Sequence, residues 1–411
     1  MKKTTLMLAT ALAASFAAAE GGINEFNDLG YGTLSGKLQS LSMYRDYDNG
    51  NNNYSSTLSI QLDYLSPTTN GWTAGFSYIG VGVVDAMDLD NPPAGLGPGE
   101  ALLGNGRVNL LNEAFLDYNL EDFALTNTTV WAGRKVNNAE VFRANAVRSK
   151  ARSIQALAIE SKDLPQTRVT VGHADRMSNW IQSGDQWNFR DFGDVFGVGY
   201  DTDGVTWGEA VNTSYENIEL AAFDAIAWDV CNLLGFRGRF GLSEDITLLG
   251  YYRNETDIGQ AADRDSNVLG ISIETKVNAL TLEGGYFGVY GDDLRFQETT
   301  TGINHTLGDS MMIFARHYEG GANTLYAKAV TKLEKTATTL YGLYNYTRHD
   351  TGKAGKSLRS GHELNFIAKQ PIPKFDNLTV ALKLGFGYRD GYNGAPDIFG
   401  TDTRLFVTYG F

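Results

Sequence analysis

Apolar and polar residues alternate in segment after segment of this chain, and each segment ends at a cluster of turn-forming residues. Between Leu58 and Tyr64, and again between Leu378 and Tyr388, every second residue is apolar and the residues between are small or polar. The same alternation recurs in segment 269–274. A period of two residues predicts β-strands that have one apolar face and one wet face.

The connections between these segments fall into two classes. Short turns are predicted at Ser66–Asn70, Glu121–Asp122, Asp163–Gln166, Ser243–Asp245, Lys276–Asn278, Glu334–Lys335 and Pro371–Asn377. Longer polar loops are predicted at Asp85–Val108, Met177–Val205, Asp292–Ala322 and His349–Ser360. Short turns at one end of the strands and long loops at the other are typical of a transmembrane antiparallel β-barrel, whose closed sheet leaves no unpaired edge in the lipid.

The pattern predicts eighteen strands, running from about Gly32 to Phe411. An even number is expected because both chain ends should lie at the short-turn end. We place Val195–Asp201 and Met311–His317 inside long loops; other choices would give sixteen or twenty strands. A wall of this size exceeds the eight or so strands whose side chains can fill a barrel, so we expect an open interior.

The first nineteen residues have the pattern of a secretory signal peptide. Lys2 and Lys3 precede an apolar stretch, Leu6–Phe16, and Ala17–Ala19 offers the small residues that a signal peptidase needs before Glu20. The stretch is well short of the roughly 20 residues that a membrane-spanning helix requires. We therefore expect export and cleavage of residues 1–19.

Composition narrows the class further, and residues 20–411 are interpreted as one barrel domain because no repeat or linker interrupts the pattern. Without Lys2 and Lys3, 32 of the 34 basic residues remain against 48 acidic ones, a net charge of about −16, which excludes a basic nucleic-acid face. Mean hydropathy is −0.25, and no apolar run after the signal could form a spanning helix. The single cysteine, Cys231, excludes an internal disulfide.

The last strand carries a second signal. Leu405, Val407, Tyr409 and Phe411 share one face, and the final residue is aromatic. This arrangement resembles the terminal signal by which the outer-membrane insertion machinery recognises its clients. We therefore expect that machinery to be a partner.

Several segments resemble one family of membrane barrels. They are Leu34–Asp48, Leu62–Phe76, Asn112–Tyr118 (NEAFLDY), Trp131–Lys135 (WAGRK), Ala156–Asp175 (with ESKDLPQTRVTVGH) and Thr338–Thr347 (TTLYGLYNYT), together with the terminal strand. Taken together, they resemble the OprD-type porins, also called the outer-membrane carboxylate-channel family. The resemblance implies an eighteen-stranded barrel, narrowed by inward-folded loops, that passes small solutes and usually carboxylates.

The resemblance also implies a ladder of basic side chains along one wall. The matching positions are Arg134 in the AGRK segment, Arg143, Arg148 and Arg152 in or beside the loop that follows, and Arg168 after the Leu-Pro turn. That loop, Asn137–Ser149, is the best candidate for a constriction, because small residues between its arginines would let it lie flat inside the barrel. An exposed, solvated loop is the alternative.

Strand parity adds wall residues to this path. A charge facing lipid costs about 2–4 kcal/mol at the bilayer midplane, so Arg237, Arg239, Arg253 and Lys383 are predicted to face inward, opposite apolar neighbours. These charges could also merely solvate the wall. Acids predicted on the inward faces are Asp63, Glu113, Asp117, Glu219, Glu274 and Glu283. They depart from a purely basic ladder and leave the choice between anions and cations open.

The sequence contains few signs of catalytic or metal-binding residues. Gly308-Asp309-Ser310, with His305 or His317 nearby, resembles the start of a lipase motif. A barrel phospholipase would need a Ser–His pair in register on its outer face, whereas this triplet falls in a predicted loop. The five histidines lack metal-ligand spacing, so no metal and no cofactor is expected.

The sequence as a whole favours a porin of a Gram-negative outer membrane. We expect passive diffusion of small solutes, carboxylates or amino acids among them, and no enzyme activity. A barrel enzyme and a structural or adhesin barrel are the alternatives. The bilayer is an expected partner and nucleic acid is not; monomer and trimer are both open.

Overall fold

The computed structural model describes residues 26–50, 52–84, 96–97, 103–182, 184–261, 264–297, 311, 317–349, 360–373, 375, 377–391 and 396–411. The predicted signal peptide and Ser310 lie outside these residues. Eighteen described strands form the wall: β1 (Thr33–Tyr47), β2 (Asn52–Leu65), β3 (Trp72–Val83), β5 (Val108–Asn119), β6 (Thr128–Lys135), β7 (Ser153–Ser161), β8 (Thr167–Ser178), β10 (Val205–Tyr215), β11 (Ile218–Ala227), β12 (Cys231–Gly241), β13 (Ile246–Asp257), β14 (Asp265–Val277), β15 (Leu280–Gly291), β16 (Ala322–Leu333), β17 (Thr338–His349), β18 (Gly361–Pro371), β19 (Leu378–Arg389) and β20 (Ile398–Gly410).

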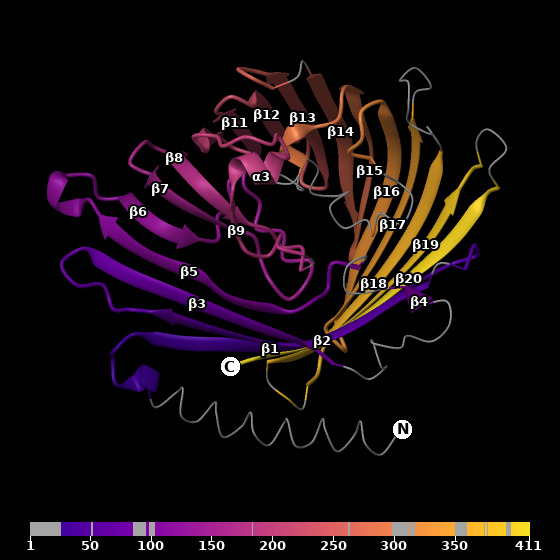
Figure 1. Ribbon diagram of the computed structural model, residues 1–411, viewed down its shortest axis with the longest axis horizontal. Helices are drawn as coiled ribbons and strands as arrows, with labels where there is room; N and C mark the ends of the chain where they lie inside the picture. The colour runs from indigo at the N-terminus through magenta and orange to yellow at the C-terminus, as the bar shows by residue number, and fades with distance from the viewer. Residues whose placement is uncertain are drawn as a thin grey trace.

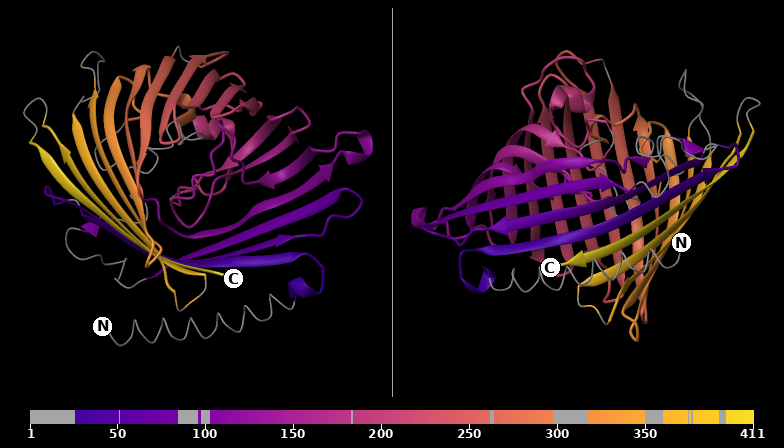
Figure 2. Two further views of the ribbon diagram at one scale, coloured as in Figure 1. Left: turned by 180° about the vertical axis from the view of Figure 1, so that it is seen from behind. Right: turned by 60° about the horizontal axis from the view of Figure 1, so that its bottom comes forward.

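The wall is one closed antiparallel sheet (Figure 1). Each strand pairs with the next wall strand, and β1 pairs with β20 from Lys37↔Gly410 to Tyr47↔Gly400. Closure continues past the last strand residue, where the backbones of Gly36 and Phe411 exchange two hydrogen bonds of 2.7 and 3.0 Å. The strands run obliquely around the barrel (Figure 2). The predicted fold and strand count are confirmed.

The alternation seen in the sequence matches the two faces of the wall. On β14, Leu269, Ile271 and Ile273 are 45–51% exposed on the outward face, whereas Val268 and Ser272, at alternate positions, are buried on the inward face. Outward apolar side chains suit a lipid environment, and the inward face is mixed. Parity therefore gives each strand residue its side of the wall.

Short connections are not confined to one end of the barrel. Where the structure describes them, the predicted short turns are present, and left-handed asparagines close two of them, Asn70 (φ 51°) and Asn278 (φ 54°). At the opposite end of the barrel, which we call the loop side, the β1–β2 and β11–β12 connections are also short. Segregation of turns and loops is thus less strict than predicted.

The described helices are short: η1 (Glu121–Phe123), α3 (Phe192–Phe196) and η2 (Arg295–Gln297). In the part of the chain that the structure covers, no helix is long and apolar enough to cross a membrane. Two further short strands are not part of the closed ring: β4 (Leu96–Gly97) pairs with β2, and β9 (Phe189–Asp191) pairs with β8. Segment 195–201 belongs to a loop, as predicted, whereas residues 312–316 lie outside the described chain.

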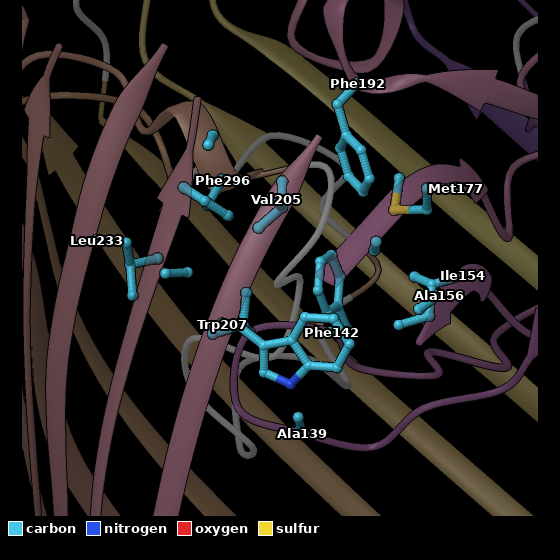
Figure 3. Packing of buried hydrophobic residues seen from close by; sticks show 14 of the residues in the cluster. Ala139, Phe142, Ile154, Ala156, Met177, Phe192, Val205, Trp207, Leu233 and Phe296 are labelled. Carbon is cyan, nitrogen blue, oxygen red and sulfur yellow. The ribbon is translucent and has the colours of Figure 1, made fainter. Parts of the chain in front are cut away.

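Loops that enter the barrel create an apolar core inside it (Figure 3). Phe142, from the loop between β6 and β7, packs edge-on against Trp207 of β10, with ring centroids 5.1 Å apart. The ring centroid of Phe192 in α3 lies 6.0 Å from that of Phe142. Phe296 of η2 joins the same cluster. One side of the interior is therefore filled by packed side chains.

Candidate functional site

Loop three, residues 136–152 between β6 and β7, lies inside the barrel. Ala139, Val141 and Phe142 are 0–1% exposed, and they pack in the interior core with residues from the wall. The alternative of a solvated external loop is wrong. Loop three is therefore placed where it can narrow the interior, as predicted from the sequence.

An ion-pair network, which we call the loop-three network, holds this loop to the wall. The Glu140 carboxylate accepts from Arg143 of the same loop (2.6 Å) and from Arg237 of β12 (3.0 Å). The Glu140 backbone amide donates to Glu209 of β10 (2.5 Å). Glu209 also pairs with Arg168 of β8 (2.7 Å). Three arginines predicted from sequence thus meet at two buried carboxylates.

The network continues along the inward faces of β11, β12 and β14. Arg237 pairs with Glu219 at 2.5 Å, and Arg239 pairs with Glu274 at 3.2 Å. The Arg239 side chain is 44% exposed, compared with 15% for Arg237. Both arginines face inward, as parity predicts, and each already has an acidic partner.

The C-terminal half of loop three is different. The Arg148 guanidinium donates to the Leu103 carbonyl (3.1 Å), Lys150 Nζ to the Ala151 carbonyl (2.8 Å), and Arg152 to the Arg143 carbonyl (2.8 Å). Burial lowers the pKa of both Arg148 and Lys150 well below their ordinary values, and nearby cations lower them further. These side chains hold backbone in place inside the protein.

A second cluster, which was not predicted from the sequence, lies where β1 meets β20. Arg45 and Arg404 both pair with the buried Asp402, at 2.6 and 2.8 Å. The signal was available, because Arg404 precedes Leu405 on a strand whose outward residues are apolar. Lys383 of β19, which was predicted, faces the same side of the interior and lies over the Phe406 ring at 5.6 Å.

Two residues that were predicted to line the solute path, Arg134 and Arg253, do not line the open interior. Arg134 pairs in register with Ala114 and shares the outward face of β6 with the exposed Ala132, so it does not line the interior. Its guanidinium stacks on Phe189 at 4.3 Å. Arg253 faces inward but is fully buried, against Glu255 and beneath η2, where no open surface reaches it.

Lys135 takes the inward position that was expected of Arg134. Its ammonium pairs with Asp117 of β5 at 2.8 Å and lies 4.3 Å from the Phe115 ring centre. Glu113, on the same strand, accepts the Val136 amide at the start of loop three (2.8 Å). Inward acids therefore also help to position the loop.

The interior thus presents arginines that are held in place yet partly accessible: Arg143, Arg168, Arg237 and Arg239, whose side chains are 15–44% exposed. A planar guanidinium can bind a carboxylate through two parallel hydrogen bonds. Because the resident partners are themselves carboxylates, a solute carboxylate can share or exchange these contacts.

No catalytic or metal centre is visible among the described residues. They hold no group of three histidine, cysteine, aspartate or glutamate side chains that could bind a metal ion. His317, the partner considered for the lipase-like triplet, is fully buried and packs against Tyr318 and Phe287 on the inward side. It does not lie on the outer face, where a phospholipase would need it.

No protein-family model matches the chain, and no curated protein matches its sequence. Solved structures do resemble it. A BenF-like porin from Pseudomonas fluorescens superposes with a TM-score of 0.74 at 16% identity, covering 92% of this chain and 98% of that one. Pseudomonas aeruginosa OccK2 in complex with glucuronate gives 0.72 at 14% identity, with 92% and 98% covered. Acinetobacter baumannii OccAB4 gives 0.71 at 16% identity, with 92% and 97% covered. At these identities the likeness establishes a shared barrel fold.

Proposed function

We propose that this protein is an outer-membrane porin of the OprD type, through which small solutes, carboxylates among them, diffuse passively. The loop-three network carries the proposal, because it places partly exposed arginines on an inward-folded loop and on the wall that faces it. The proposal includes export, cleavage before Glu20 and insertion into a Gram-negative outer membrane.

The similar structures support this class of function. One is named a porin, and another was solved in complex with glucuronate, which is a sugar carboxylate. An eighteen-stranded wall also leaves more interior than side chains alone can fill. No observation on the described residues favours a barrel enzyme. The assembly, monomer or trimer, stays a prediction that native mass spectrometry in detergent can test.

The test removes the two accessible arginines that share Glu140. We expect Arg143→Ala with Arg237→Ala to shift the reversal potential toward cations in planar bilayers. Uptake of a small carboxylate into liposomes should slow by at least roughly ten-fold, because the loss of even one charge-assisted hydrogen bond costs about 1.5–3 kcal/mol. The shift should shrink as salt rises, since screening shortens the reach of partly exposed charges.

Arg134→Ala is the matched control, because it removes one guanidinium from the outward face and leaves the interior intact. Both proteins must show the same heat-dependent migration in detergent gels. If the double variant conducts and selects like the parent at low salt, loop three does not set selectivity. A parent protein that gives neither conductance nor solute flux would refute the porin assignment.

A further inference from the structure

Three arginines of the described strands face outward, and one of them stands apart. Arg134 stacks on Phe189, and Arg176, whose register partner is the outward-facing Gln155, pairs with Asp191 at 3.0 Å. Arg348, near the loop-side end of β17, is exposed. In the part of the chain that the structure describes, its guanidinium contacts no acid, carbonyl or ring.

The register shows that Arg348 points away from the interior. The hydroxyls of Thr324 and Thr347 bond to each other at 2.9 Å, and both side chains are fully buried, so this pair faces inward. The next pair along, Asn323 with Arg348, must face outward. Leu325, two residues from Asn323, is 58% exposed on that face. Arg348 therefore lies on the lipid-facing surface at the loop side.

A histidine on the neighbouring strand shares this surface. His362 of β18 is the register partner of Tyr346, and their ring centroids are 4.6 Å apart. Its Nδ1 is bonded to the Tyr344 hydroxyl at 2.8 Å, which leaves Nε2 as the nitrogen for another ligand. Arg348 is two residues from Tyr346, so it is a diagonal neighbour of His362, roughly 7–8 Å away.

Tyrosines surround these two groups. Tyr344, Tyr346 and Tyr388 all have their rings within 6.2 Å of the His362 ring. Tyrosine rings on the outward face are typical of the level where lipid headgroups begin. We call Tyr344, Tyr346, Arg348, His362 and Tyr388 the β17–β19 band; the three strands lie side by side in Figures 1 and 2.

The β17–β19 band has a polar neighbour toward the loop side and apolar neighbours toward the turn side. An acid at its edge, Asp397, is already held by the Tyr388 hydroxyl (2.5 Å) and the Gly391 amide (2.7 Å). Toward the turn side, Leu364 and Phe366 continue the outward face of β18 and are 37% and 46% exposed. Polar donors thus stand over an apolar surface that acyl chains would cover.

We propose that the β17–β19 band binds a phosphorylated lipid of the extracellular leaflet, with Arg348 and His362 donating to its phosphate. A guanidinium at the membrane interface that has no counter-ion among the described residues favours an anionic headgroup, and its planar donors match phosphate oxygens. The apolar residues below the band receive the acyl chains. This inference rests on the proposed function, because it requires the barrel to stand in an outer membrane.

The test measures equilibrium binding of purified lipopolysaccharide to the detergent-solubilised protein, beside the same material after enzymatic removal of its phosphates. We expect the parent to bind the phosphorylated form about ten-fold more tightly, since two charge-assisted contacts depend on phosphate. Arg348→Gln with His362→Gln should lose about that factor, whereas Arg134→Gln, the outward cation that already has partners, should bind like the parent. Binding should weaken as salt rises.

Conductance separates this inference from the proposed function. The double variant should keep the parent's conductance and ion selectivity, because both residues face away from the interior. Equal binding of both lipopolysaccharide forms by the parent, or unchanged binding by the double variant, would overturn the site. Equally tight binding of phosphatidylglycerol vesicles would overturn its assignment to an extracellular-leaflet lipid. A parent that binds but does not conduct would refute the porin assignment alone.

Discussion

Basic side chains have different roles in loop three and in the wall strands that face it. Loop three contributes Arg148, Lys150 and Arg152, which are at most 8% exposed and donate to backbone carbonyls. The wall contributes Arg168, Arg237 and Arg239, whose side chains are 15–44% exposed and pair with carboxylates. The same chemical groups therefore stabilise a loop in one region and offer binding contacts in the other.

Access to water explains the difference. A cation taken out of water is costly unless fixed polar groups replace its hydration, and the loop carbonyls do so. Such a side chain can contact a solute only if it breaks its hydrogen bonds to the loop carbonyls, which would open the loop. A half-exposed arginine beside a carboxylate keeps part of its hydration, so a solute can exchange contacts at small cost. Exposure, more than residue type, decides which arginines belong to the path.

The largest effect expected from this comparison is on stability. Arg152→Ala removes a buried guanidinium and the hydrogen bond that it donates to the Arg143 carbonyl. We expect the free energy of unfolding to fall by about 2–4 kcal/mol, because buried hydrogen-bonding groups then lack partners. Denaturant unfolding of the protein in lipid vesicles measures this loss.

Arg239→Ala is the matched control for that experiment, since it removes a side chain that is 44% exposed. The comparison between the regions breaks down if Arg152→Ala unfolds like the parent and instead shifts ion selectivity as much as the Arg143/Arg237 double variant does.

The next effect is a dependence on pH that comes from Lys150. Burial, with the nearby charge of Arg152, lowers the pKa of Lys150 well below its ordinary value of 10.5. Between the two values the unfolded chain holds a proton that the folded chain has released. Stability should therefore rise with pH through this window, by at most ~1.4 kcal/mol per pH unit. Below the pKa of Lys150 in the folded protein, the full free-energy cost of burying its charge remains. Above pH 10.5 this cost vanishes, because Lys150 is neutral in both states.

Lys150→Met tests whether Lys150 causes this pH dependence, because the substitution keeps the length of the side chain and removes the charge. We expect the variant to be more stable than the parent near pH 7 and to lose the parent's rise in unfolding free energy toward about pH 10. Arg239→Gln, which leaves Lys150 unchanged, should follow the parent's slope. A Met variant with the parent's pH profile would mean that Lys150 is not the group responsible.

The smallest effect belongs to Arg239, the most exposed of the four partly accessible arginines that face the interior. Arg239→Gln separates an ion pair of 3.2 Å in which the arginine is 44% exposed. Exposed pairs contribute about 0–1 kcal/mol, so unfolding should change little. The reversal potential should still shift slightly toward cations at low salt, and less than in the Arg143/Arg237 double variant. An equal or larger shift would place the narrowest part of the path at Arg239.

The wall was largely predictable from the sequence, because each strand's exposure repeats every two residues. The apolar run at Leu382, Leu384 and Phe386 placed Lys383 inward, and the structure agrees. The family resemblance had placed Arg134 on the ladder, and strand alternation gave no independent check there, because Val130 and Trp131 are adjacent and both apolar. The structure buries Trp131 in the interior core and turns Arg134 outward.

The contacts inside the barrel were not predictable, because they join residues far apart in the chain. Arg237 meets Glu140 across 97 positions, and Arg45 meets Asp402 across 357. Alternation sets which face of a strand a residue occupies, since that is a local property of extended backbone. Which charges pair, which loop arginines lose their water and which cation is left facing the lipid depend on how loops fold across a closed sheet, and only the tertiary structure decided them.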